Sequence, residues 1–183
     1  MRIVHLFAAV AALLLAGCAS YSPVLDPTAA PKPGMAYLAG IFIDQSPPRT
    51  GLPIYLGISY EHSETGTLHT LAFQKEDKRE IQAIEVPPGT YRVQGWFMSN
   101  FSNEVLARGK TQGPLFMRQL KIAANQVYFL GQYTGSGTIT TGGNMIYYNA
   151  TMRPERLVRG PADEKALAAR YPNIAKLPLH NAF

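Results

Sequence analysis

Few side chains of this 183-residue chain are placed for chemistry, and two histidines come closest to a metal-binding arrangement. His62 and His69 flank a Thr-Gly turn signal at 65–66, so a hairpin closing there would set the two imidazoles opposite each other, with Glu61 and Glu64 nearby. Imidazole and carboxylate groups are ligands of zinc and copper. The same residues also fit the polar open end of a hairpin. With no CxxC or HxxxH motif, we expect no metal or other cofactor and keep His62 and His69 as the metal candidates.

Catalytic motifs are missing from the sequence. There is no GxSxG, and the histidines beyond the N-terminal region are His62, His69 and His180. The acidic residues are dispersed, which disfavours a glycosidase with two facing carboxylates. A Ser-His-Asp arrangement assembled in space stays open as an alternative. We therefore predict a protein that is not an enzyme.

A Gly/Thr-rich stretch at 133–145 resembles a phosphate-binding loop in composition. Such a loop joins a strand to the N-terminus of a helix, whose amides hold the anion. Here strand-like segments stand on both sides. We interpret the stretch as a long hairpin loop that is free to contact a partner.

The single cysteine, Cys18, comes shortly after a run of almost wholly apolar residues at 3–16, which itself follows Met1 and Arg2. A positive start, an apolar run and small residues at its end are the layout of a secretory signal peptide. The run is shorter than the roughly 20 residues that a spanning helix needs. We predict a signal peptide over 1–17, and a lone cysteine after it has no partner for an internal disulfide.

The order Leu15, Ala16, Gly17, Cys18 resembles the bacterial lipobox at all four positions. The resemblance implies that a diacylglyceryl group is joined to the Cys18 sulfur, that cleavage occurs before Cys18, and that the new amino group is acylated. Ala19 stands where an Asp would signal retention at the inner membrane. The implied location is the periplasmic face of the outer membrane, with exposure at the cell surface as the alternative. An ordinary signal peptide with an accidental cysteine is the alternative.

The chain after Cys18 divides into three parts. Residues 18–33 contain four prolines and no apolar period, which predicts a lipidated, flexible tether, with an N-terminal strand docked on the domain as the alternative. Residues 34–152 are predicted to form one β-sandwich, and residues 153–183 a C-terminal helix and tail. In the helix, Pro161 stands near the first turn and Leu167 and Tyr171 share a side. We expect this helix to dock on a sheet face carrying Trp96, Tyr128 or Leu130.

Lys and Arg exceed Asp and Glu by five over the full chain, but they do not form a block. The densest group, at 75–80, alternates basic with acidic residues. That pattern is typical of a solvated turn rather than of a nucleic-acid surface. We expect no nucleic-acid partner, and expect the membrane to be contacted through the lipid anchor.

Hydrophobic residues alternate with polar ones along most of the predicted domain, which indicates strands. The candidate strands are 35–44, 54–60, 67–74, 80–86, 91–97, 116–123, 127–133 and 145–152. Short strands separated by turn signals favour a single antiparallel β-sandwich. In the hairpin around 65–66, the predicted register sets Tyr60 opposite Leu71 and Ile58 opposite Phe73.

The sequences of residues 84–95 and 120–131 align without gaps, and each is predicted to form a strand, a turn and a second strand. The turn positions Gly89 and Asn125 are residue types that tolerate positive φ. The runs IEVPPGTYRVQGWF and LKIAANQVYFLGQY resemble uncharacterised bacterial lipoproteins with an immunoglobulin-like or transthyretin-like β-sandwich. The resemblance implies a fold, since its motifs are structural turns, and implies no activity.

Aromatic residues that alternate with the predicted core are the remaining binding candidates. Trp96, Tyr128 and Tyr148 could form an outward patch for carbohydrate, peptide or protein, or be buried under the C-terminal helix. We favour a lipid-anchored, non-catalytic β-sandwich that binds or scaffolds an envelope partner, either a protein or peptidoglycan. The alternative is a ligand- or metal-binding envelope lipoprotein, or a hydrolytic one.

Overall fold

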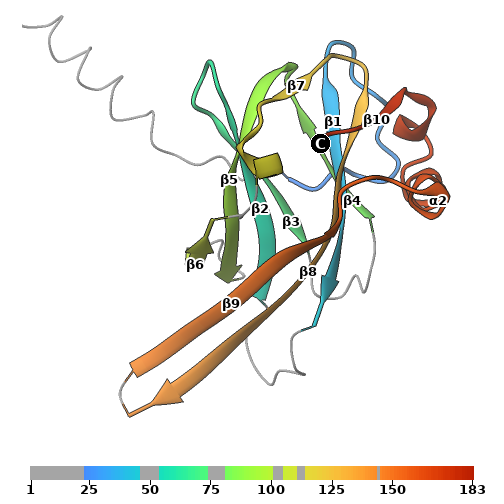
Figure 1. The fold of residues 1–183 in the computed structure, drawn as a ribbon. Coiled ribbons are helices and arrows are strands. Elements are labelled where there is room, and N and C mark those ends of the chain that lie inside the picture. The colour runs from blue at the N-terminus through green and yellow to red at the C-terminus, as the bar shows by residue number, and fades with distance from the viewer. Residues whose placement is uncertain (1–22, 46–53, 74–80, 101–104, 111–113, 144) are drawn as a thin grey trace, which may run out of the picture.

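A computed structural model describes residues 23–45, 54–73, 81–100, 105–110, 114–143 and 145–183. Cys18, the predicted signal peptide and the charged turn at 75–80 lie outside the described residues. In the described part, the chain forms strands in two stacked sheets, one α-helix and two short 3-10 helices, η1 (Pro114–Met117) and η2 (Ile174–Lys176) (Figure 1). No described helix is long and apolar enough to cross a membrane.

Sheet A has the order β10-β8-β1-β4, and β9 also pairs with β8. Sheet B has the order β3-β2-β5-β6, and β7 also pairs with β5. The strands of sheet A are β1 (Ala36–Asp44), β4 (Ile81–Val86), β8 (Val127–Gly142), β9 (Met145–Arg156) and β10 (Leu179–Asn181). Those of sheet B are β2 (Ile54–His62), β3 (Leu68–Phe73), β5 (Gly89–Asn100), β6 (Val105–Gly109) and β7 (Leu120–Ile122).

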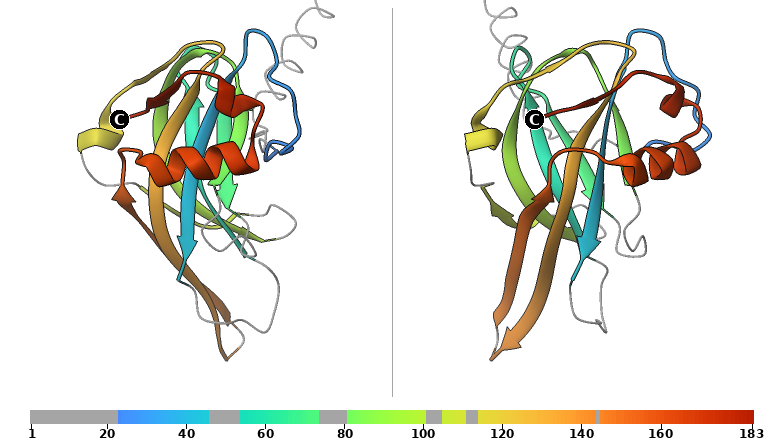
Figure 2. Two further views of the ribbon diagram at one scale, coloured as in Figure 1. Left: turned by 90° about the vertical axis from the view of Figure 1, so that its right-hand side faces the viewer. Right: turned by 45° about the vertical axis from the view of Figure 1, so that its right-hand side comes forward.

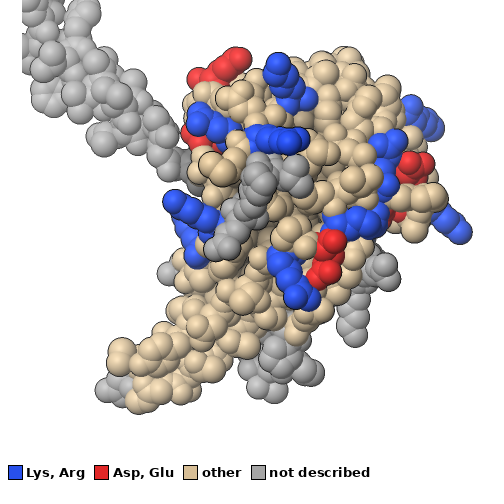
Figure 3. Space-filling view, in the orientation of Figure 1, with Lys and Arg blue, Asp and Glu red and all other residues tan. Residues whose placement is uncertain are grey.

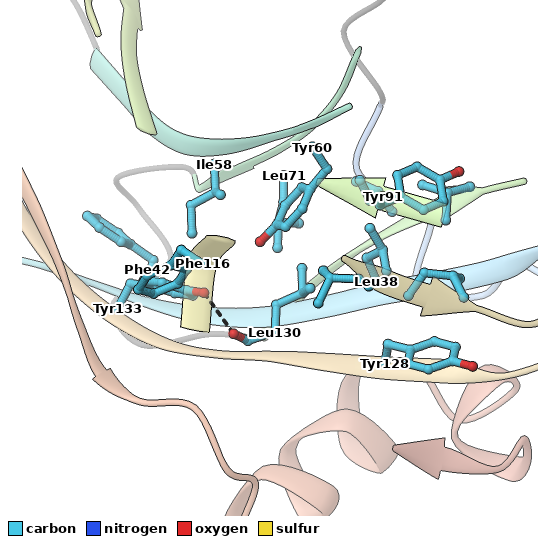
Figure 4. Packing of buried hydrophobic residues seen from close by; sticks show 14 of the residues in the cluster. Leu38, Phe42, Ile58, Tyr60, Leu71, Tyr91, Phe116, Tyr128, Leu130 and Tyr133 are labelled. Atoms are coloured by element: carbon cyan, nitrogen blue, oxygen red, sulfur yellow. Dashed lines mark hydrogen bonds between the residues drawn. The ribbon is translucent and has the colours of Figure 1, made fainter. Parts of the chain in front are cut away.

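The main core fills the space between the two sheets. Sheet B contributes Ile58, Tyr60 and Tyr91, and sheet A contributes Leu38 and Leu130, all fully buried (Figure 4). These residues occupy alternate positions of their strands, as a half-buried strand requires. The prediction of a mostly β, sandwich-like fold is confirmed at this level.

The pairing of sheet A corrects the prediction of a purely antiparallel sandwich. β1 pairs antiparallel with β4 but parallel with β8, and β10 also runs parallel to β8. Parallel neighbours need a long connection between them. Here the chain between β1 and β8 passes through sheet B. The alternation of apolar and polar residues within one strand does not show which strands become neighbours, so it could not predict this pairing.

The β2–β3 hairpin forms where it was predicted, but its register differs by two residues. Ile58 pairs with Leu71 and Tyr60 with His69, because the His62 amide bonds to the Thr67 carbonyl and the connecting loop is longer than a two-residue turn. The predicted pairing of His62 with His69 is therefore wrong. A shift of two keeps every side chain on its predicted face.

The two aligned segments, 84–95 and 120–131, form similar turns that connect different strands. Gly89 has φ 155° and Asn125 φ 58°, so both adopt the predicted positive φ. Each turn links a strand of one sheet to a strand of the other, since β4 and β8 lie in sheet A and β5 and β7 in sheet B. These turns close the same end of the sandwich.

Helix α2 (Pro161–Arg170) covers the outer face of sheet A (Figure 2). Leu167 and Tyr171 pack with η2 against Val127 and Phe129, forming a second core. The helix was expected on Tyr128 or Leu130, or on Trp96 of sheet B. Tyr128 and Leu130 alternate with the true contact residues and point into the main core instead.

The segment from Pro23 to Pro33 lies against the domain, which corrects this part of the tether predicted over 18–33. The Leu25 amide donates to the Ala83 carbonyl at 2.8 Å, and the Lys32 ammonium pairs with the Glu85 carboxylate at 2.8 Å. The prolines do not prevent these contacts, and the segment makes a turn in which the Ala29 amide donates to the Asp26 carbonyl at 3.0 Å. At the other end, β9 continues to Arg156 and β10 joins sheet A, so the body also extends past the predicted boundary at 152.

The Gly/Thr-rich stretch is a strand, not the loop that was predicted. β8 continues to Gly142 and β9 begins at Met145, and their pairing runs without interruption from Gly135 opposite Met152 to Gly142 opposite Met145. The paired ends project beyond the sandwich (Figure 1). No helix follows this stretch, so the phosphate-loop geometry is not formed.

Candidate functional site

The outer face of sheet B carries a groove with a volume of about 660 Å³. Four neighbouring strands and the turn before β3 form it. Its lining residues are Ser59, Glu61, Gly66, Leu68, Thr70, Gln94, Gly95, Trp96, Phe97, Ser99, Val105, Arg108, Gly109 and Lys110. While α2 covers the outer face of sheet A, this face of sheet B is hollowed.

A bulge and two glycines shape the groove. The β2–β5 register shifts at Ser59 and Tyr60 and leaves Gln94 as an extra residue, and such a bulge bends a strand. The ring of Phe97 lies where a side chain on Gly57 would stand, since a Cβ there would be 2.5 Å from Phe97 Cζ. Gly95 has φ 151° and its Cβ would collide with the Gly109 carbonyl oxygen. Gly57 therefore lets the Phe97 ring lie close to β2, and Gly95 lets the backbone of β6 lie close to β5.

Two buried hydroxyl groups line the groove without a hydrogen-bond partner. Ser99 is 1% exposed and Thr70 is 9% exposed, and neither Ser99 Oγ nor Thr70 Oγ1 bonds to any group of the residues that the structure describes. A buried polar group without a partner costs about 1–3 kcal/mol. Their capacity to donate and accept a hydrogen bond is thus unused among the described residues.

Charge at the groove is slightly positive. The Glu61 carboxylate accepts a hydrogen bond from the Gln94 amide. Arg108 and Lys110 are exposed at the rim, and no ion pair within the described residues involves them. The lining thus combines hydroxyls, an amide, a carboxylate and two cations with the rings of Trp96 and Phe97 and the side chains of Leu68 and Val105.

The predicted metal candidates pack in the interior rather than forming an open site. The His62 ring lies 4.9 Å from the Tyr91 ring and the His69 ring 5.7 Å from it. The Thr65 amide donates to His62 Nδ1 at 3.4 Å, and His62 Nε2 lies 3.4 Å from the Pro88 carbonyl oxygen. Both ring nitrogens of His62 are therefore engaged by the backbone of two turns.

The carboxylates expected beside these histidines point elsewhere. Glu61 lines the groove on the opposite face of sheet B, and Glu64 is exposed in the turn. Within the described ranges, no three His, Cys, Asp or Glu residues come together as a metal site. Burial and the neighbouring His62 charge lower the pKa of His69 below its usual value.

The structure separates the three aromatic residues of the predicted patch. Trp96 lines the groove, whereas Tyr148 lies on the projecting hairpin and is 36% exposed. Tyr128 is 8% exposed, and its hydroxyl accepts from the Ala123 amide at 2.9 Å and donates to Gln126 at 2.7 Å. These residues do not form one surface, because Tyr128 packs inside and closes the turn before β8.

Sequence reasoning missed the groove as a site. Its lining comes from two pairs of consecutive strands, β2–β3 and β5–β6, which are separated in the sequence by β4 of the other sheet. The outward positions Ser59, Glu61 and Thr70 have the ordinary composition of a solvent face. The available signals were glycines at 57 and 95 inside predicted strands, since interior glycines often mark a bulge or a close approach. The bulge itself depends on pairing with β2.

No protein-family model matches the chain, and no curated protein matches it. Among solved structures, the chain is similar to part of a leucine-rich repeat protein from Bacteroides thetaiotaomicron, with 15% sequence identity and a TM-score of 0.36. The aligned part covers 55% of this chain and 12% of that chain. A similarity at this level carries no inference on fold or function.

Proposed function

We propose that this chain is a lipid-anchored protein of the bacterial envelope. The support is the sequence Leu15-Ala16-Gly17-Cys18 at the end of the N-terminal apolar run, which resembles a lipobox. Two or three acyl chains on Cys18 would hold the protein at a membrane almost permanently, because each buried methylene contributes about 0.8 kcal/mol. With Ala19 after the cysteine, the proposed location is the periplasmic face of the outer membrane.

The proposed role of the folded body is to bind an envelope partner without catalysing a reaction. The observation that carries this role is the groove on sheet B with the unpartnered hydroxyls of Ser99 and Thr70. Glu61 is hydrogen-bonded to Gln94, and among the described residues the groove lining includes no histidine or cysteine to act as a nucleophile or imidazole base. We assign the body to the immunoglobulin-like or transthyretin-like sandwiches on the resemblance of its turn motifs.

The partner would be a polar segment of an envelope protein or of peptidoglycan. Either one offers amide and hydroxyl groups that can pair with the hydroxyls of the groove. The exposed cations Arg108 and Lys110 favour a partner that carries a carboxylate.

A photo-crosslinking experiment tests the role of the groove. A photoreactive amino acid replaces Val105, which lines the groove and is 39% exposed, in the full-length protein within intact cells. The matched control carries the same amino acid in place of Lys165, an exposed residue of α2 on the outer side of sheet A. We expect a defined adduct from position 105 and none from position 165. Identical adducts at both positions, or none at position 105, would contradict the proposal.

A second candidate is the binding of a small molecule in the same groove. The volume of about 660 Å³ falls inside the range of small-molecule pockets, about 300–1,000 Å³. Native mass spectrometry of protein purified from envelopes discriminates the two candidates. A bound small molecule that is lost on Ser99→Val would favour this second function, and a macromolecular adduct at position 105 the first.

A further inference from the structure

The projecting ends of β8 and β9 carry exposed apolar side chains. We call residues 135–142 and 145–152 the arm. Its exposed large side chains are Ile139 (37%), Met145 (61%), Ile146 (57%), Tyr147 (47%) and Tyr148 (36%). Seven residue steps at about 3.4 Å make the arm about 24 Å long.

The register of the arm divides its side chains into two faces. Directly paired residues share a face, and faces alternate along each strand. One face is apolar and consists of Gly135, Gly137, Ile139, Thr141, Ile146, Tyr148, Ala150 and Met152. The other is mostly polar and consists of Ser136, Thr138, Thr140, Gly142, Met145, Tyr147, Asn149 and Thr151.

The apolar face continues the interior of the sandwich. At its base, the Phe42 ring fills the place of a Gly135 side chain, with a Cβ contact of 3.0 Å, and Ala150 and Met152 pack on the main core. Toward the tip, Ile139, Ile146 and Tyr148 carry the same stripe into solvent. The row of apolar side chains that faces the core at the base of the arm thus continues beyond sheet B, where nothing among the described residues covers it.

The arm contains no charged residue from Gly135 to Met152. Figure 3 shows this as an uncharged projection below a body that carries scattered Lys, Arg, Asp and Glu. The first charges next to the arm are Arg153 and Glu155, which pair with each other at 3.0 Å. Edge strands that face water usually carry charges or prolines that block association, and the arm has neither.

We propose that the apolar face of the arm lies in the boundary between headgroups and acyl chains of a lipid bilayer, with the polar face toward water. The proposal rests on the lipid anchorage proposed above, which keeps the arm close to a membrane at a high local concentration. Uncharged amphipathic segments with tyrosines near the tip suit this boundary, to a depth of about 5–10 Å. The boundary still hydrates the backbone groups at both open edges of the arm, which the hydrocarbon interior would not.

A second copy of the chain fits this face less well. Its three half-exposed side chains, Ile139, Ile146 and Tyr148, offer on the order of 300 Å² of contact surface, given that an aromatic side chain buries about 150–250 Å². A stable dimer needs about 800 Å² from each partner. A bilayer has no such threshold for a protein that is already anchored.

Single-cysteine labelling distinguishes the faces. In the lipidated mature protein the Cys18 sulfur would be blocked, so one introduced cysteine can carry an environment-sensitive fluorophore. Ile139→Cys and Tyr148→Cys are directly paired on the apolar face, and Thr138→Cys and Asn149→Cys are the matched pair on the polar face. The proteins are reconstituted into phosphatidylethanolamine vesicles with phosphatidylglycerol, with and without spin-labelled lipid.

We expect a blue shift and at least a twofold quenching by spin-labelled lipid at positions 139 and 148, with little change at 138 and 149. Equal responses on both faces, or none at 139 and 148, would overturn the proposal. A blue shift at 139 without quenching by lipid, dependent on protein concentration, would assign the face to a second copy instead. The intact mass reports separately whether Cys18 carries lipid, so a failed anchor is distinguished from a silent arm.

Discussion

Two buried threonines of this protein differ in what their hydroxyl groups contact. Thr134 is 3% exposed and donates to the Glu155 carboxylate at 2.6 Å. Thr70 is 9% exposed and lines the groove, and its hydroxyl has no hydrogen-bond partner in the described part of the chain. The hydroxyl of Thr134 therefore stabilises the fold, whereas the hydroxyl of Thr70 lowers its stability, as groups at binding sites commonly do.

Replacing each threonine by valine, which has nearly the same shape, tests this difference. We expect Thr70→Val to leave the free energy of unfolding unchanged or raise it by about 1 kcal/mol, because the penalty of an unpaired hydroxyl is removed. Thr134→Val should lower it, because a bond to a carboxylate is lost. Urea unfolding measures both. A clear loss of stability in Thr70→Val would show that its hydroxyl is satisfied in solution. In the same variant, crosslinking from position 105 should decrease.

His69 gives the stability of the domain a dependence on pH. Burial, and next the charge of His62, lower its pKa in the folded state below the usual 6.5. The unfolded chain therefore takes up the proton first as pH falls, so stability is complete above about pH 6.5 and decreases below it. His69 packs on the Tyr91 ring, so protonation also places a charge inside an aromatic contact.

The free energy of unfolding of the wild type should therefore decrease between pH 7 and pH 5. His69→Phe, which keeps an aromatic ring beside Tyr91, should make this dependence flatter. His180→Phe is the control, because His180 lies in β10 with its side chain exposed. If His69→Phe retained the full slope, the dependence would have another origin.

At the scale of elements, one carboxylate joins the C-terminal helix to sheet A. Asp163 in the first turn of α2 is 3% exposed and accepts from the Gly160 amide at 2.7 Å. It also accepts two bonds from the Arg156 guanidinium of β9, at 2.6 and 2.8 Å. The Asp163 carboxylate thus caps the helix and ties it to the strand that leads out of the arm.

Asp163→Ala should lower the free energy of unfolding by about 2–3 kcal/mol, since it removes a cap and leaves the half-buried Arg156 unpaired. The neighbouring Glu164 pairs with Arg159 at 2.9 Å, but both side chains are solvent-accessible. Glu164→Ala, the matched control, should cost about 0–1 kcal/mol. Urea unfolding with helix content followed by circular dichroism checks both. Equal effects of the two variants would refute the special role of Asp163.

Local patterns predicted most strands because apolar residues alternate with more polar ones in several of them, as Ile58 and Ser59 do, or because a run is apolar throughout, as in β1, which is buried on both faces. They could not predict which strands pair over long distances. The parallel pairing of β1 with β8 and the addition of β10 depend on how the chain crosses between sheets. β6 was missed because its burial pattern, with Val105 and Arg108 exposed, has no apolar alternation.

The arm shows how composition misleads. Gly, Ser and Thr between 134 and 142 indicate a loop on their own, yet each of these residues pairs with a partner in β9, whose Ile146, Tyr147 and Tyr148 favour a strand. Cross-strand pairing therefore overrides local preference. The groove could not be predicted for a related reason. Its outward polar residues form a groove only because a bulge and close-packed glycines hollow the sheet around them, and the bulge depends on long-range pairing.

At the scale of the whole molecule, the two outer faces of the sandwich have different surroundings. The face of sheet A is covered by α2, η2 and the segment around Leu25, while the groove of sheet B stays open. The arm extends from sheet A past the sandwich (Figure 2). An anchored body of this shape can contact a bilayer with its arm and leave a separate face free for a partner.

The final prediction concerns the proposed lipid anchor, because the proposed membrane contact and the proposed envelope partner both require that this chain is exported. Cys18→Ser should abolish labelling with radioactive palmitate and leave a precursor that keeps residues 1–17, since the lipobox resemblance places both lipid attachment and cleavage at Cys18. Ala19→Asp is the matched variant: it should still be lipidated and cleaved, but fractionate with the inner instead of the outer membrane. Membrane fractionation and the intact mass measure each step. Normal processing and membrane retention of Cys18→Ser would refute the anchor, and the groove and the arm would then have to be explained in a protein without one.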